Sequence, residues 1–120
     1  MILDDISDKL NELKPNKVFY GLINKELEEW DYIVFSRGVV TPTRTGYSRT
    51  FQVAVVEENY ITENYEKTVI EKVTELAGLH ATGDIEFQYV RKPNTDIVIE
   101  IMIINFVQAI KDLNGFGRVI

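Results

Sequence analysis

The most constraining feature of the sequence is an apolar segment near its end, from Ile97 to Val107. Its odd-numbered positions are mostly isoleucine, and its even-numbered positions include valine, methionine, isoleucine and phenylalanine. Successive side chains of a β-strand point to opposite faces, so both faces of this segment would be apolar. The pattern predicts a central strand of a sheet, or a strand whose second face meets another subunit.

Two helices are expected to cover such a sheet. Apolar residues recur at helical spacing in one segment that starts at Ile2 and is ended by Pro15, and in another that starts at Thr62 and is ended by Gly78. The apolar stripes consist of Ile2, Leu3, Ile6, Leu10 and Leu13 in the first segment, and of Tyr65, Val69, Val73 and Leu76 in the second.

Four further strands are predicted from β-branched and aromatic residues, at Lys17–Tyr20, Tyr32–Arg37, Phe51–Val56 and Ile85–Arg91. The sequence thus predicts an α+β fold of order α-β-β-loop-β-α-β-β. A mostly antiparallel sheet would carry both amphipathic helices on one face, in two layers. Residues 1–110 would form one domain, and residues 111–120 a C-terminal tail. We expect Asn24–Glu29 to be a helical turn or surface loop, a short helix to begin at Gln108, and Asn114–Gly115 to form a turn.

The segment from Gly38 to Thr50 differs in composition from the rest of the chain. It holds Arg37 at its border, then Arg44 and Arg49, and residues 36–50 contain no acid, although the whole chain has a net charge of −6. The proline, glycines and hydroxyl residues predict a long loop between two strands. Such a basic loop complements the acidic remainder of a second copy, and together with Tyr47 it has the residue types that are enriched at interfaces. A solvated loop with scattered arginines is the alternative.

The composition excludes several kinds of chemistry. The chain has no cysteine and a single histidine, His80, so thiol catalysis and a zinc site of cysteines or several histidines are excluded. Its acidic balance disfavours general nucleic-acid binding, since phosphate binding needs a cationic surface. Glu86 and Glu100 could act as an acid/base pair only if their two strands brought them into one concave site. We therefore expect a protein that is not an enzyme, with no cofactor and no metal, and we expect His80 to lie in a surface loop.

Three segments together resemble the small neck and tail proteins of long-tailed bacteriophages and prophages, in particular the tail-terminator or tail-completion family. They are the run Glu29–Phe35 followed by the basic loop, the strand Phe51–Val56, and the run Tyr89–Asp96 followed by the apolar strand. The element order is similar as well. Trp30, at the start of the first run, is expected to anchor the core or, alternatively, an interface.

The resemblance implies a structural protein that ends tail-tube polymerisation and forms the tail-to-head joint as a homo-oligomeric ring, a hexamer in that family. Its partners would be further copies of itself, the tail tube and the head connector. DNA would pass through without specific binding, no membrane would be involved, and the protein would be a virion component assembled in the bacterial cytoplasm. The predicted contact residues are Arg37, Arg44, Tyr47, Arg49, Glu100 and Met102. A small monomeric binding module for a peptide or metabolite is the alternative function.

Overall fold

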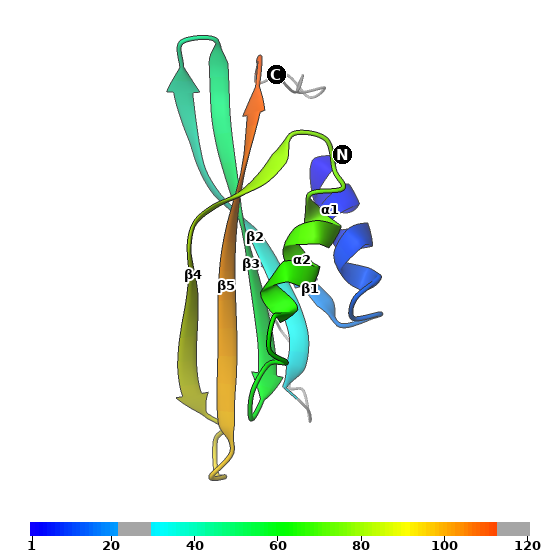
Figure 1. The fold of residues 1–120 in the computed structure, drawn as a ribbon, viewed down its shortest axis with the longest axis vertical. Helices are drawn as coiled ribbons and strands as arrows, with labels where there is room; N and C mark the ends of the chain where they lie inside the picture. Colours follow the sequence, from blue (N-terminus) through cyan, green and yellow to red (C-terminus); the bar gives the residue numbers. More distant parts are fainter. Residues whose placement is uncertain (22–29, 113–120) are drawn as a thin grey trace.

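The computed structural model describes residues 1–21 and 30–112 as a five-stranded sheet with two helices on one face (Figure 1). The elements are α1 (Ile2–Asn11), β1 (Val18–Tyr20), β2 (Asp31–Thr43), β3 (Gly46–Glu58), α2 (Tyr65–Val73), β4 (Leu79–Arg91) and β5 (Val98–Ile110). The strands lie in the order β1-β2-β3-β5-β4, and every neighbouring pair is antiparallel except β1 with β2. The predicted α+β class and its mostly antiparallel sheet are confirmed, and β5 is an interior strand.

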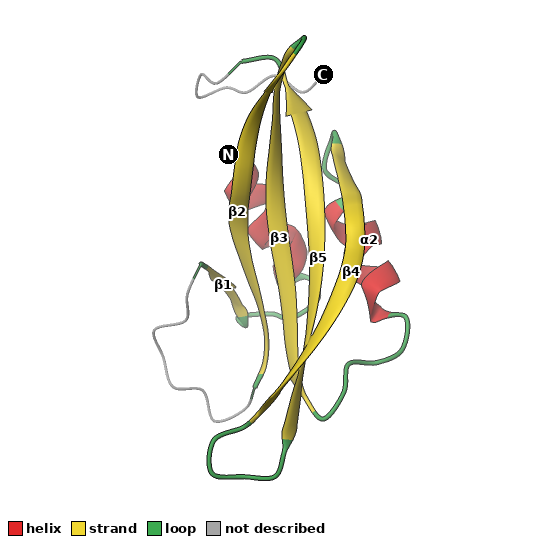
Figure 2. Cartoon of the chain, turned by 90° about the vertical axis from the view of Figure 1, so that its left-hand side faces the viewer, coloured by secondary structure: helices red, strands yellow, loops and turns green. Residues whose placement is uncertain are grey.

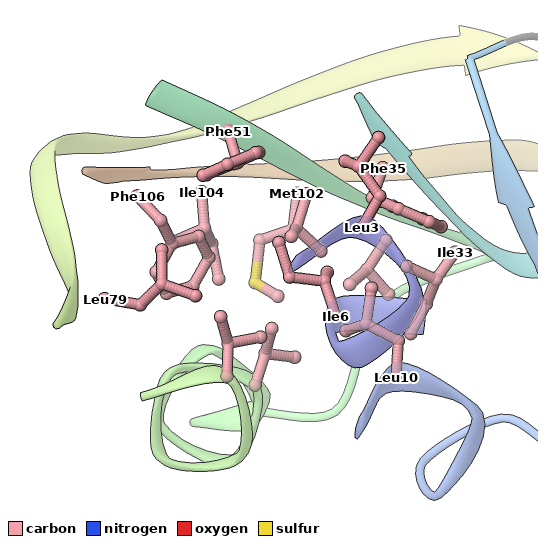
Figure 3. Close-up of a cluster of buried hydrophobic side chains, with 14 of the residues drawn as sticks. Leu3, Ile6, Leu10, Ile33, Phe35, Phe51, Leu79, Met102, Ile104 and Phe106 are labelled. Atoms are coloured by element: carbon pink, nitrogen blue, oxygen red, sulfur yellow. The ribbon is translucent and has the colours of Figure 1, made fainter. Parts of the chain in front are cut away.

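The core lies between the helices and one face of the sheet, which we call the helix side (Figure 3). In α1 the residues at helical spacing, Leu3, Ile6 and Leu10, are buried as the apolar stripe predicts. From the other elements the core takes Val69 and Val73 of α2, and Ile33, Phe35, Phe51, Val53, Val55, Leu79, Met102, Ile104 and Phe106 of the strands. The opposite face carries no helix among the described residues and is shown in Figure 2.

Lys14 ties the end of the first helical segment to the sheet. Its ammonium group forms ion pairs with Asp31 and, at 3.3 Å, with Glu57, and it lies 5.6 Å from the centre of the Tyr65 ring. Burial works against its charge, but the hydrogen bond to Asp31 and the charge of Glu57 outweigh burial and raise the pKa of Lys14. One side chain therefore links residues that belong to β2, β3 and α2.

The predicted long loop from Gly38 to Thr50 is wrong. β2 continues to Thr43 and β3 begins at Gly46, so the two strands form one hairpin with a two-residue turn. Valine, threonine and tyrosine are good strand residues, and here they extend the ladder that the apolar parts of β2 and β3 begin. The prediction rests on proline and glycine, which are common in loops. Proline is also compatible with the edge of a sheet, and β2 is an edge at Pro42 because β1 pairs only with Ile33–Phe35.

A bulge lies where β2 passes from the core into this hairpin. The register shifts between Arg37 and Val40. The amide of Val39 donates to the hydroxyl oxygen of Thr50 at 2.8 Å. This hydrogen bond replaces the backbone partner that the amide loses at the bulge. A side chain at Gly38 would disturb this contact, because its Cβ atom would lie 2.2 Å from the same hydroxyl oxygen and the threonine would have to move.

Several element boundaries also differ from prediction. β4 begins at Leu79, so His80 lies in an edge strand and not in a loop. β5 continues to Ile110, so the short helix predicted from Gln108 is wrong. α2 is shorter than predicted: its N-cap is Asn64 instead of Thr62, and the helix ends at Val73. Asn24–Glu29 and Asn114–Gly115 lie outside the described residues.

Phe106 provides a test of the core. It is fully buried on the helix side of β5, opposite Phe51 of β3. We expect Phe106→Ala to lower the free energy of unfolding by about 3–5 kcal/mol, since it removes apolar contacts and leaves a cavity. Urea denaturation measures this change. Gln52→Ala, at an exposed position of β3, is the control and should change stability by less than about 0.5 kcal/mol. Equal effects of the two substitutions would contradict this description of the core.

Candidate functional site

The hairpin of β2 and β3 projects beyond both helices at one end of the molecule (Figure 1). We call residues 37–50 the arginine arm. It carries Arg37, Arg44 and Arg49 and no acidic residue. The molecule measures 50 × 26 × 22 Å, and the arm occupies one end of its long axis. A basic segment without acids therefore lies at one end of an acidic chain.

Arg49 is held at the base of the arm by Gln108 of β5. The Oε1 atom of Gln108 accepts hydrogen bonds from Nε and from one terminal nitrogen of Arg49, at 2.9 and 2.6 Å. The Nε2 atom of Gln108 in turn donates to the carbonyl of Ala77 at 2.9 Å. The guanidinium also lies 5.6 Å from the centre of the Phe51 ring. Arg49 is thus fixed by neutral partners, which leave its charge uncompensated.

The other two arginines of the arm are also without acidic partners in the described part of the chain. Arg37 donates from Nε to the hydroxyl of Tyr20 at 3.1 Å, and Arg44 is exposed in the turn. Burial lowers the pKa of Arg49, and the nearby positive charge of Arg37 lowers it further. The fold therefore places the positive charges of Arg37 and Arg49 near each other, and an acidic group from outside would stabilise both.

Of the other predicted contact residues, Tyr47 lies in the arm and two lie near the core. Tyr47 is half-buried and is opposite Ile110 of β5. Met102 is fully buried on the helix side, so it has no surface to offer a neighbour while the helices stay in place. Glu100 keeps 9% exposure, and its Oε1 atom accepts the amide of Ile61 at 2.7 Å.

Glu86 and Glu100 do not form an acid/base pair. Glu86 is opposite Ile103 and Glu100 is opposite Tyr89, and since partners in register share a face, the two carboxylates point to opposite faces of the sheet. Glu100 hydrogen-bonds to the Tyr89 hydroxyl, which raises the pKa of that tyrosine. In the described residues, no three histidine, aspartate or glutamate side chains are grouped to hold a metal ion.

At the opposite end of the molecule, Glu58 of β3 connects the segment before β2 with the segment between β4 and β5. This residue forms an ion pair with Lys92, in the connection between β4 and β5, and accepts the amide of Trp30 at 3.3 Å. The hydrogen bonds from Lys92 and from the Trp30 amide hold the pKa of Glu58 below its ordinary value. Trp30 itself is half-buried, with its ring 6.4 Å from that of Tyr32, and it lies outside the main core cluster.

Sequence reasoning missed Gln108 and Tyr20, the residues that position the arginines. A signal was present for Gln108, since it is a polar residue that continues the even-numbered, buried positions of the apolar strand. No signal pointed to Tyr20, because its contact depends on the parallel pairing of β1 with β2.

Comparison with known proteins finds structural neighbours but no relative by sequence. No protein-family model and no curated protein matches the sequence. Among solved structures, the chain is similar to a chain from the virion of a native gene transfer agent particle. The TM-score is 0.37 and the identity 14%, over 85% of this chain and 90% of the other. A similarity of this size assigns neither a fold family nor a function. In the described residues, neither helix is long and apolar enough to span a membrane.

Gln108 provides a test of how the arm is held. Replacing it with leucine removes the acceptor for Arg49 and the donor to Ala77 while nearly preserving side-chain volume. We expect Gln108→Leu to lower the free energy of unfolding by about 2 kcal/mol, because a partly buried guanidinium and a carbonyl lose their partners. Urea denaturation provides the measurement, with Gln52→Leu as the exposed control on β3. A stability equal to wild type would show that Gln108 does not anchor Arg49.

The ion pair at Glu58 predicts a dependence on acid. Because the pKa of Glu58 is lowered in the folded state, its stabilisation is complete above its unfolded pKa of about 4.3 and is lost as the pH falls through the folded pKa. We expect Glu58→Gln to flatten this part of the acid dependence of the urea midpoint. Glu63→Gln, an exposed glutamate with no ion pair among the described residues, should leave it unchanged. Identical acid profiles for wild type and Glu58→Gln would contradict the prediction.

Proposed function

We propose that this protein is a structural assembly protein that joins copies of itself into a closed ring. The observation that carries the proposal is the arginine arm, whose three guanidinium groups lack acidic partners among the described residues. The chain nevertheless has a net charge of −6. Arginine is the basic side chain best suited to interfaces, because its planar fork binds carboxylates in pairs of hydrogen bonds and stacks on aromatic rings.

Ring closure needs two different surfaces on each copy. A head-to-tail contact places one patch of a subunit against another patch of the next, and repeated rotation then closes the ring. The arm supplies a basic projecting surface, and the acidic remainder of the chain supplies its complement. The arm also lies at an extreme of the long axis (Figure 1), where it can reach a neighbour without disturbing its own core.

The biological setting that we propose is the neck of a phage or prophage tail. The sequence resembles tail-terminator and tail-completion proteins, which implies a hexameric ring that stops tail-tube growth and contacts the head connector. An acidic lumen would let DNA pass without adhesion, since like charges repel phosphate. In this proposal the protein has no catalytic activity, and it becomes part of the virion after assembly in the bacterial cytoplasm.

The test measures absolute mass by light scattering after gel filtration. We expect wild-type protein to form a ring-sized species, and Arg44→Glu to shift it towards the 13.8 kDa of a single chain. Arg44 suits this test better than Arg49 because it is exposed and makes no contact with the core. Lys67→Glu is the matched control, since it changes an exposed charge of α2 by the same amount. A wild-type protein that remains a monomer at high concentration would contradict the proposal.

A further inference from the structure

The exposed large apolar side chains of the described residues gather mainly at the two ends of the long axis. At one end, Val39 and Val40 of the arginine arm are 63% and 53% exposed. At the other end lie Tyr60, Phe87, Tyr89 and Val98, with exposed fractions of 75%, 44%, 61% and 46%. Figure 1 shows these ends as the β2–β3 turn and the β4–β5 connection, both beyond the helices. Apolar surface grouped in this way indicates contact with other molecules.

We call the second group, together with the carboxylate of Glu100, the far-end patch: Tyr60, Phe87, Tyr89 and Val98. Phe87 and Tyr89 are opposite Met102 and Glu100 in the ladder, so they lie on the helix side of the sheet. Tyr60 directly precedes Ile61, whose amide binds the Glu100 carboxylate. The patch thus places a carboxylate near aromatic and aliphatic side chains.

This combination of groups suits a guanidinium. Aromatic rings attract a cation over their faces, and a carboxylate in less polar surroundings forms strong, charge-assisted hydrogen bonds. Glu100 has no ion pair with a basic side chain in the described part of the chain; its partners there are the Ile61 amide and the Tyr89 hydroxyl. Arg91 is opposite Val98 and so lies on the same face, but it forms no ion pair with Glu100, and the carboxylate can still accept a cation.

We propose that the far-end patch is the docking site for the arginine arm of a second copy of this chain. In that contact Arg44 of one copy approaches Tyr89 and Glu100 of the next, and the exposed valines of the arm cover the aromatic rings. The two surfaces are complementary, since the arm holds arginines without acidic partners, and the patch holds a carboxylate that forms no ion pair in the described residues, although Arg91 is opposite Val98 on the same face. The inference rests on the proposed self-assembly and adds the pair of surfaces that makes it.

The placement of the two surfaces determines the kind of assembly. The arm and the patch lie at opposite ends of a molecule 50 Å long, so a copy cannot dock its arm on its own patch. The two surfaces also differ from each other, so each contact is head-to-tail, and every copy offers one arm and one patch. A two-fold dimer would instead require a surface that matches itself.

A mixing experiment tests this arrangement. Arg44→Glu damages only the arm, and Tyr89→Lys damages only the patch, where it adds a positive charge beside Glu100. Each variant alone should be monomeric by light scattering. An equimolar mixture should rise towards twice the 13.8 kDa chain mass and no further, because the intact arm of one variant can dock on the intact patch of the other.

Matched controls separate a lost contact from a lost fold. Gln88→Lys introduces the same charge on the same strand but on the other face, since Gln88 is opposite Ile101, and it should assemble like wild type. Circular dichroism should show that every variant is folded. Should Tyr89→Lys fail to fold, Tyr60→Lys replaces it, at a side chain that is 75% exposed.

The outcomes distinguish this inference from the proposed function. A wild-type protein that never self-associates overturns both. A wild-type ring that survives both Arg44→Glu and Tyr89→Lys overturns the arm-to-patch contact and leaves self-assembly standing. A mixture of the two variants that stays monomeric, although each is folded, likewise overturns the head-to-tail pairing.

Discussion

The shape of the molecule depends on the burial of the helix side of the sheet beneath two short helices. α1 has 10 residues and α2 has 9, so each is about 15 Å long or less. The strands β2 to β5 have 13 residues each, or about 43 Å when extended. The helices can therefore cover only the middle of the sheet. Both ends must extend past the core, and the arginine arm and the far-end patch are the surfaces that result.

Basic residues are divided between two uses in this fold. The lysines of the described residues mostly form ion pairs with acids of the same chain, as Lys9 does with Glu75 at 3.1 Å and Lys72 with the same residue at 3.4 Å. Exposed pairs of this kind contribute little stability, but they neutralise acidic surface locally. The arginines of the arm take no part in such pairs. Lysine thus balances charge within the chain, and arginine remains available for contacts outside it.

Local pattern was sufficient to predict the core and insufficient to predict the ends. The stripe of α1 and the alternation of β5 follow from spacing alone, and the structure buries Ile6, Leu10 and Ile104 as these patterns require. The arm could not be predicted in this way, because its strand character depends on cross-strand partners in β5, such as Ile110 opposite Tyr47. Gly38 indicated a break in the chain, whereas it permits a bulge that the Thr50 hydroxyl completes.

The same reason explains why the sequence could place some of the candidate contact residues in the fold and not others. Charge composition alone located the arginines in one segment. It could not show that Met102 faces the core, because apolar residues occupy both faces of β5 and the sequence does not say which face the helices cover. Nor could it show that Tyr89 would lie beside Glu100, since that contact depends on the register of β4 with β5.

Both edges of the sheet carry interruptions. In β2, Pro42 lacks an amide hydrogen and lies just beyond the bulge at Gly38. In β4, the register shifts between Thr82 and Glu86, and Gly83 has a left-handed backbone at φ +72°. Regular, unpaired edges would allow copies to add strand to strand without limit, as fibrils do. These interruptions therefore disfavour open-ended growth of a newly made chain, and in the proposed ring the contacts between copies would be made by side chains, which can specify where growth stops.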